Sequence, residues 1–170
     1  MNQQVILLRG INVGGHHRLP MRELCALLQK LGLQNPRSYI QSGNVVGAGR
    51  VEAGAISDAI ERAKGFRPQV LVLPADAFIA IAKALPFTEP DGKLVYIWFP
   101  ASRFTFDQAK ADRLRAETET LHITDHAIFL HAPDGIGRSK LAAKIETLAG
   151  VPCTARNMNT VRKLLQMLDA

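Results

Sequence analysis

Apolar runs and stretches of helical periodicity alternate along the first half of the chain. The runs are short and carry branched aliphatic residues, which is typical of buried strands, whereas the longer stretches keep apolar residues 3 to 4 positions apart. Polar residues at 42–44 interrupt one apolar stretch, and we interpret them as a kink within a single strand. The expected elements are a strand at 5–8, a helix at 21–31, a strand at 38–46, a helix at 51–64, a strand at 70–73 and a helix at 75–85.

A second series of elements follows a break at residues 86–92, where two prolines and an Asp-Gly pair predict a linker. Asp107 is placed to cap a helix whose face is only sparsely apolar, so we expect much of that helix to be exposed. Asn157 is placed to cap the last helix. The expected elements are a strand at 94–99, a helix at 107–120, a strand at 127–130, a helix after the turn at 134–140, a short strand near 153–155 and a helix from 157.

This order of elements favours an α+β fold. Strands and helices alternate in each half, but the long parallel repeat of a doubly wound sheet is missing. We therefore expect two α/β sandwich halves, 1–86 and 87–170, each with a small sheet and helices on one face. The two halves show no repeat at the level of sequence.

Composition narrows the class of protein. The 170 residues are 47% hydrophobic and 21% charged, and no apolar run approaches the ~18 residues that a membrane span needs. The first residues lack the basic start and cleavage pattern of a signal peptide. Two isolated cysteines, Cys25 and Cys153, favour a reducing compartment over a disulfide scaffold. We expect a cytoplasmic protein with no membrane partner.

Charge is distributed unevenly around a net value of +6. Residues 1–50 contain six basic side chains and one acidic side chain, and residues 138–170 contain six and two. Residues 86–137 contain five basic and eight acidic side chains. If the two basic ends meet in space, they form one positive face, and the expected partner is an anion such as nucleic acid or a nucleotide.

The stretch 9–15 is the strongest candidate site. It follows the first strand and contains one arginine and three glycines, which let backbone N–H groups face an anion. The alternative is a tight strand-to-helix connection in which the asparagine merely caps its own turn. The candidate ligands here are Arg9, Gly10, Asn12, Gly14 and Gly15.

Three further polar clusters are candidate ligands of the same anion. Ser42 and Asn44 flank a glycine, although a β-bulge explains them equally well. The stretch 135–140 lacks the spacing of a P-loop. A serine between two cations at a helix start is nevertheless also typical of an anion-binding site. An ordinary capped loop is the alternative there, and a plain asparagine cap is the alternative at the last helix. These two clusters comprise Arg138, Ser139, Lys140, Arg156, Asn157 and Asn159.

Catalytic and metal-binding patterns are weak. His16 and His17 lie in the glycine-rich stretch and are more typical of solvated residues than of metal ligands. His122, His126 and His131 straddle a turn and a strand and do not share a face. The GxSxG, HExxH and Cys–His arrangements do not occur, and the carboxylates cluster in the middle of the chain. The sequence indicates no metal site and leaves the cofactor unknown.

Four stretches together resemble the bacterial domain-of-unknown-function 1697 family, and the resemblance spans nearly the whole chain. It implies two ferredoxin-like halves and brings no established activity. The chain departs from the family pattern at Met158, where a tryptophan is usual, and at Gly47, where a phenylalanine is common. The first departure weakens any role that depends on stacking at the last helix. The matching stretches are LLRGINVGG at 7–15, YIQSGNVV at 39–46, DGIGRSKL at 134–141 and ARNMNTV at 155–161.

Two functional hypotheses follow. The first is a binding module that holds phosphate groups on a basic face built from the glycine-rich stretch and the start of the last helix, which requires no catalytic base. It predicts that Arg9 and Arg156 converge. The alternative is an enzyme acting on a small phosphorylated or carboxylated substrate, in which these two arginines clamp the anion and a histidine or serine transfers protons.

Overall fold

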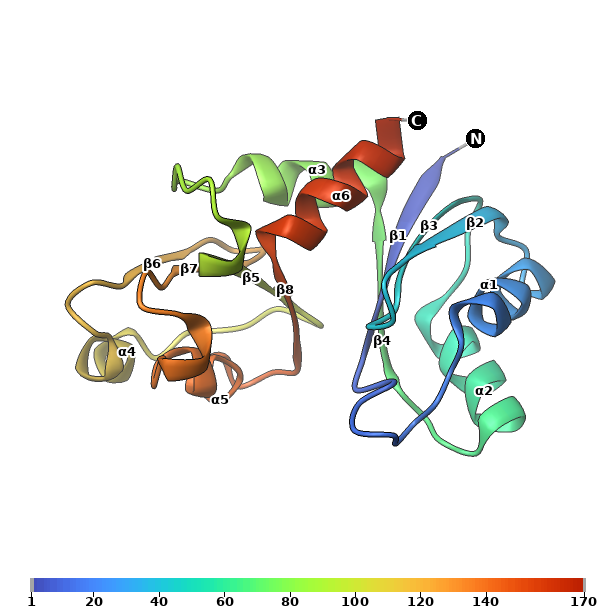
Figure 1. Cartoon of the computed structure of the whole chain (residues 1–170), viewed down its shortest axis with the longest axis horizontal. Helices are drawn as coiled ribbons and strands as arrows, with labels where there is room; N and C mark the ends of the chain where they lie inside the picture. The colour runs from blue at the N-terminus through green and yellow to red at the C-terminus, as the bar shows by residue number, and fades with distance from the viewer. Residues whose placement is uncertain (1, 170) are drawn as a thin grey trace. The chain divides into compact units, whose positions relative to one another are not determined.

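The computed structural model describes residues 2–169, and they form two compact units (Figure 1). The first unit is the chain up to Ala80 together with the segment from Lys163 onward, and the second is Ile81–Arg162. Each unit has a four-stranded antiparallel sheet and its own helices, so the α+β fold class is confirmed. Among the described residues, no helix combines the length and the apolar character needed to cross a membrane.

The first unit has the βαββαβ order of a ferredoxin-like sandwich. Its sheet order is β2-β3-β1-β4, so β3 lies between the two strands that α1 connects, which is a split βαβ arrangement. The helix α3 (Ala75–Lys83) follows. The elements are β1 (Gln3–Arg9), α1 (Met21–Lys30), β2 (Gln34–Tyr39), β3 (Asn44–Ala48), α2 (Ala53–Lys64) and β4 (Gln69–Pro74).

The single strand expected at 38–46 was wrong, because these residues belong to two strands. β2 ends at Tyr39, and the chain then reverses through residues 40–43 and returns as β3 with Tyr39 opposite Asn44. The polar residues that we interpreted as a kink are therefore a hairpin connection. The Asn44 amide closes it by donating hydrogen bonds to the Tyr39 carbonyl at 3.0 Å and to the Ser42 hydroxyl at 2.9 Å.

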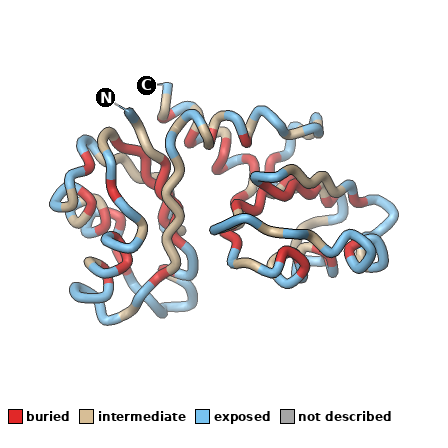
Figure 2. The backbone as a smooth tube through the Cα atoms, turned by 180° about the vertical axis from the view of Figure 1, so that it is seen from behind, coloured by how far each residue is buried: buried red, intermediate tan, exposed pale blue. Residues whose placement is uncertain are grey.

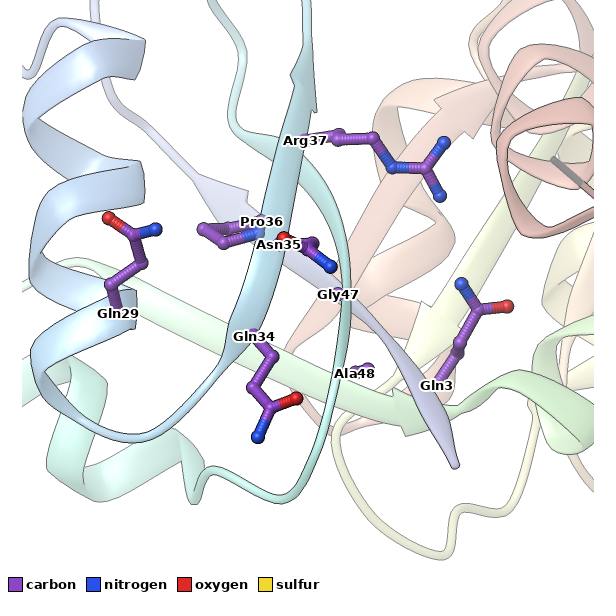
Figure 3. Close-up of a pocket in the computed structure, with 8 residues that line it drawn as sticks. All are labelled: Gln3, Gln29, Gln34, Asn35, Pro36, Arg37, Gly47 and Ala48. Carbon is purple, nitrogen blue, oxygen red and sulfur yellow. The ribbon is translucent and has the colours of Figure 1, made fainter. Parts of the chain in front are cut away.

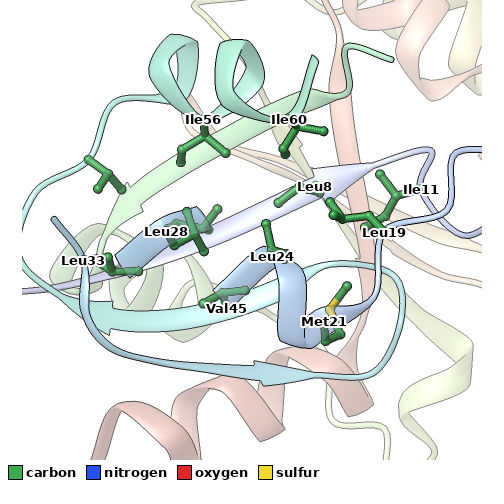
Figure 4. Close-up of a cluster of buried hydrophobic side chains, with 12 residues drawn as sticks. Leu8, Ile11, Leu19, Met21, Leu24, Leu28, Leu33, Val45, Ile56 and Ile60 are labelled. Carbon is green, nitrogen blue, oxygen red and sulfur yellow. The ribbon is translucent and has the colours of Figure 1, made fainter. Parts of the chain in front are cut away.

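The core of the first unit lies between the sheet and its two helices. Leu8 of β1 lies in one buried cluster with Leu24 and Leu28 of α1 (Figure 4). Ile6, two positions earlier on the strand, belongs to the same cluster. Gly47 of β3 also borders this core, since a Cβ there would lie 2.6 Å from the Leu33 side chain. A phenylalanine at position 47, the common residue of the family pattern, would therefore have no space unless Leu33 moved. The buried cluster comprises Ile6, Leu8, Ile11, Leu19, Met21, Leu24, Leu28, Leu33, Val45, Val51, Ile56 and Ile60.

The second unit repeats the same topology without sequence similarity to the first. Its sheet order is β6-β7-β5-β8, which matches the first unit strand for strand, so both ferredoxin-like halves are confirmed. The buried core includes Trp98, Ile128, Leu130, Leu141 and Ile145. The elements are β5 (Val95–Pro100), α4 (Gln108–Leu114), β6 (Thr120–Ile123), β7 (Ile128–His131), α5 (Ile145–Ala149) and β8 (Cys153–Asn157). The last helix, α6 (Met158–Asp169), begins in this unit, and its residues from Lys163 onward belong to the first unit.

Two expected helices of the second half are shorter in the structure. α4 begins after its Asp107 cap, as predicted, but ends at Leu114, and residues 120–123 form a strand instead. Ala111 is the buried residue of α4, so little packing holds a longer helix in place. The helix expected after 134–140 is divided into a 3₁₀ turn (Ala142–Lys144) and the five-residue α5, and another 3₁₀ turn (Ile136–Arg138) lies within 134–140.

Burial separates the framework from the loops. The central strands of each unit are buried, whereas many of the connections are exposed (Figure 2). The candidate residues at 9–15 lie at the end of β1 and in the connection after it, and Ser42 and Asn44 lie in the connection after β2 and at the start of β3. The same sheet therefore positions both.

Candidate functional site

The glycine-rich stretch forms a tight β-hairpin turn. The Val13 N–H donates to the His16 carbonyl at 3.3 Å, and the His16 N–H donates back to the Val13 carbonyl at 2.9 Å. Gly14 and Gly15 between them have φ of 57° and 77°, and a type I′ turn requires positive φ at both central residues. The glycine pair thus has a structural role. We call residues 12–17 the glycine-rich hairpin.

The tip of this hairpin is open. A Cβ at Gly15 would meet no atom within 4 Å, and a Cβ at Gly14 would meet only the His16 ring at 4.0 Å. Val13 is 63% exposed. Within residues 2–169, no acceptor is bonded to the N–H of Gly14 or Gly15. Two adjacent backbone donors therefore face solvent on a turn whose shape is already set.

The base of the hairpin is anchored by the Asn12 side chain. Its Nδ2 donates to the Leu19 carbonyl at 2.9 Å and to the Gln41 carbonyl at 2.8 Å, and its Oδ1 accepts from the Leu19 N–H at 2.8 Å. Asn12 has φ of 53°, which asparagine tolerates better than most residues. The amide that we predicted as a ligand is thus engaged within the protein, and it joins the hairpin to the loop after β2.

A second anchor is the ring of His17. Its Nδ1 lies 3.0 Å from the Gly10 carbonyl, and the ring stacks on Phe66 with centroids 4.5 Å apart and planes 14° apart. This histidine therefore fixes the hairpin against the segment after α2. Together with Asn12, it makes the hairpin a pre-organised element of the surface.

The loop after β2, residues 40–43, is equally constrained, and we call it the Ile40 loop. Gly43 has φ of 91°, and a Cβ there would lie 2.7 Å from the Leu8 Cβ. The Gly43 carbonyl accepts from the Leu8 N–H at 2.8 Å, and Asn44 is fully buried. Asn44 thus braces the turn from inside, while Ser42 is half-buried. The β-bulge interpretation of this segment was wrong.

Ile40 is a residue that the sequence analysis missed. It has φ of 51° and is 49% exposed. A β-branched residue is a genuine outlier in this backbone region. No sequence pattern marks it, because an isoleucine after a tyrosine is typical of a strand interior.

Positive charge accompanies both loops. Arg9 at the end of β1 is exposed, with its Nη1 3.5 Å from the Gln69 side-chain oxygen, and Arg18 after the hairpin is exposed. Neither 9–22 nor 34–50 contains an acidic residue. Elsewhere in the same unit, Lys64 pairs with Glu23 and Arg67 with Asp58. The loops thus present cations without an acidic residue in the same segments.

The cluster at 138–140 has the geometry of an ordinary capped turn. The Ser139 Oγ is buried and accepts from the Ala142 N–H at 3.0 Å. No α-helix begins there, which corrects our expectation, since the next one is the five-residue α5. Arg138 and Lys140 are exposed on either side. These residues therefore do not form an anion-binding helix N-terminus. Arg138 and Lys140 stay candidate ligands because of their positive charge.

At the last helix, Asn157 is a cap whose Oδ1 accepts from the Thr160 N–H at 3.0 Å. Arg156 is only 9% exposed, and its Nη1 donates to the Ala155 carbonyl at 2.9 Å. Burial lowers the pKa of Arg156 to about 10, which leaves it charged at neutral pH.

Asn159 is exposed and packs on Gly92, where a Cβ would overlap its side chain. Met158 is 3% exposed, so this position does not present a stacking surface.

The expected convergence of Arg9 and Arg156 stays a prediction. The structure links the glycine-rich hairpin to the Ile40 loop through the Asn12–Gln41 hydrogen bond, and both belong to the first unit. The candidates at 138–140 and 156–159 belong to the second unit. Within the described chain, no group of three His, Cys, Asp or Glu side chains is placed to hold a metal ion.

A hollow of about 520 Å³ lies on the first unit (Figure 3), and none of the predicted ligands lines it. Amide side chains dominate its lining, and neither a carboxylate nor a histidine contributes. Its guanidinium, from Arg37, donates to the Met167 carbonyl at 2.6 Å. The hollow thus lacks an acid–base pair. It is lined by Gln3, Gln29, Gln34, Asn35, Pro36, Arg37, Gly47 and Ala48.

Comparison with known proteins agrees with this fold and assigns no activity. Over 98% of both chains, the structure is similar to that of the conserved bacterial protein SP0830 from Streptococcus pneumoniae, with 26% sequence identity and a TM-score of 0.73. No curated protein matches the sequence significantly. The sequence profile described as "Protein of unknown function (DUF1697)" matches residues 1–129. This match covers most of the chain, which therefore belongs to the DUF1697 family.

Proposed function

We propose that this protein is a cytoplasmic binding module for a phosphate-containing anion, most simply nucleic acid or a nucleotide, and that the glycine-rich hairpin is its main contact element. One observation carries the proposal: the N–H groups of Gly14 and Gly15 are open on a pre-organised turn. Backbone N–H groups in such turns donate hydrogen bonds to bound anions. Ser42 of the same unit stays a candidate contact, and Arg138 and Lys140 of the second unit stay candidates through their charge.

The charge of the segment supports the same partner. Arg9 and Arg18 flank the hairpin, and arginine contacts phosphate with a fork of donors that stays charged at neutral pH. The turn is held by Asn12 and His17, so binding would not incur the entropy of ordering it. Two isolated cysteines, Cys25 and Cys153, support a reducing compartment over a disulfide scaffold.

Salt and length dependence test the proposal. We would measure the fluorescence anisotropy of labelled dT5, dT10 and dT20, with ATP as competitor, between 50 and 200 mM salt. A strand that contacts Z cations should lose affinity with a log–log slope of about −0.7Z. Replacing Arg9 and Arg18 together by glutamine should therefore reduce the slope by about 1.4.

Arg50→Gln is the matched control. Arg50 lies in the same unit but beyond the other end of β3, has a side chain 86% exposed, and pairs with Glu52 at 3.3 Å. It should keep the wild-type slope. Equal effects of the Arg50 and Arg9/Arg18 replacements would argue for unspecific charge attraction. Full saturation by ATP, with no gain from longer strands, would instead support a pocket for a small anion.

Two variants at Gly14 test the backbone donors. Gly14→Asn keeps positive φ and the N–H, because asparagine is a favoured residue of type I′ turns, and it should retain binding. Gly14→Val strains the turn and should abolish binding, while the exposed position leaves the core intact. If Gly14→Val binds dT20 like wild type, the hairpin is not the contact element.

A further inference from the structure

The two exposed large hydrophobic side chains of the described chain lie in the two loops of the candidate site. Val13 is 63% exposed in the glycine-rich hairpin, and Ile40 is 49% exposed in the Ile40 loop. The 2.8 Å bond from the Asn12 amide to the Gln41 carbonyl joins residues adjacent in sequence to each of them. Two apolar side chains from distant parts of the sequence are therefore presented on joined loops.

Ile40 is held in an unfavourable backbone conformation without an evident benefit to folding. A residue at its φ of 51° costs ~1–2 kcal/mol, and more when it is β-branched. Such strain persists only where the surroundings impose it, and here Gly43 and Asn44 fix the loop from within the core. An asparagine would fit this backbone better and would leave less apolar surface in water. The fold therefore does not explain why this position is an isoleucine, and we attribute it to a role of the exposed apolar side chain.

We infer that Val13 and Ile40 pack against the faces of unpaired nucleobases while the glycine-rich hairpin holds the adjoining phosphates. This inference rests on the proposed function and specifies its ligand as a single strand or a locally unstacked duplex. Isoleucine is among the apolar residues that proteins insert between bases. The site thus combines apolar contacts for bases with donors for phosphates.

The observations favour nucleic acid over a protein partner. A stable protein interface buries at least about 1,000 Å² of total surface, and two partly exposed side chains supply only a small part of that. Arginines flank the apolar pair, and acidic residues are absent from 9–22 and 34–50. A nucleic acid strand complements both features at this scale, because each nucleotide joins one apolar base face to one phosphate.

The test separates base contacts from phosphate contacts. The full-length protein would be titrated with labelled dT20 and with a 20-unit abasic strand that has the same phosphates and no bases. Wild type should bind dT20 about tenfold more tightly than the abasic strand. Ile40→Asn should lose most of this preference and keep its affinity for the abasic strand. Val13→Thr, which keeps the β-branched shape, should lose part of the preference.

The possible outcomes are distinct. Equal binding of both strands by wild type would overturn the base contact and leave phosphate binding standing. A preference for dT20 that survives in both variants would also overturn the role of the apolar pair. Binding of neither strand would refute this inference and nucleic acid as the ligand of the proposed function, and ATP binding alone would then leave the nucleotide as its ligand. A melting temperature several degrees lower in Ile40→Asn, with unchanged base preference in Val13→Thr, would show that Ile40 is structural.

Discussion

Asn12 joins the two loops of the candidate site, and its replacement offers a quantitative test of that role. Its amide makes three hydrogen bonds between 2.8 and 2.9 Å, two to Leu19 and one to Gln41. Leu19 is fully buried and Ile11 is 2% exposed, so the core begins on both sides of the hairpin. Loss of the amide should therefore reduce the stability of the first unit and not merely loosen an exposed loop.

The magnitude follows from the number of bonds. A typical net contribution is about 1 kcal/mol for each hydrogen bond, and the bond to Gln41 is exposed and counts for less. We expect Asn12→Gly to reduce the free energy of unfolding by about 2–3 kcal/mol. Asn12→Ala loses the same bonds and, unlike the glycine variant, keeps a Cβ at φ of 53° without the amide that helps asparagine to tolerate this backbone, so it should be ~1–2 kcal/mol less stable than Asn12→Gly.

Two measurements check these values. Urea unfolding gives the free energy of each variant, and hydrogen exchange of the Leu19 amide reports on the first unit alone, since this N–H donates to Asn12. Asn35→Gly is the matched control. Asn35 shares a positive φ (49°) with Asn12 but is exposed, and its side chain forms no hydrogen bond within the described residues.

The control should leave both measurements near the wild-type values. The reasoning would be refuted if Asn12→Gly unfolded within ~0.5 kcal/mol of wild type, the range typical of unimportant surface positions. If Asn12→Gly and Asn12→Ala reduced the free energy of unfolding equally, only the expected cost of a Cβ at this positive φ would be refuted.

Two further predictions concern other positions. Asn157→Ala should lower the stability by about 1 kcal/mol through loss of the cap on Thr160, as measured by urea unfolding, and a larger loss of dT20 affinity than this explains would indicate ligand contact. Burial raises the pKa of the Cys25 thiol, so alkylation by iodoacetamide at pH 8 should be slower than that of glutathione, and an equal rate would contradict this. Because the unfolded thiol ionises first, this contribution to stability is fully present below the ordinary thiol pKa and is lost as pH rises from there through the raised pKa of the folded protein.

Local signals in the sequence predicted much of the framework. The apolar spacing located β1, α1, β4 and α6, and the asparagine and aspartate caps located the starts of two helices. These features depend on neighbours within about one helical turn or on a simple alternation, so the sequence alone contains them. The glycine-rich stretch was also recognisable as an exposed connection.

Contacts between distant residues decided the rest. Asn12 and Gln41 are 29 positions apart, and their hydrogen bond turns a predicted ligand into a brace. Arg156 is a surface cation by composition, yet the fold buries it beside the Ala155 carbonyl. Ile40 has a left-handed backbone because the loop is fixed by Gly43, three residues later, which packs closely on Leu8. A polar side chain becomes a ligand or a brace according to what the folded chain places beside it, and residue type and spacing do not encode those neighbours.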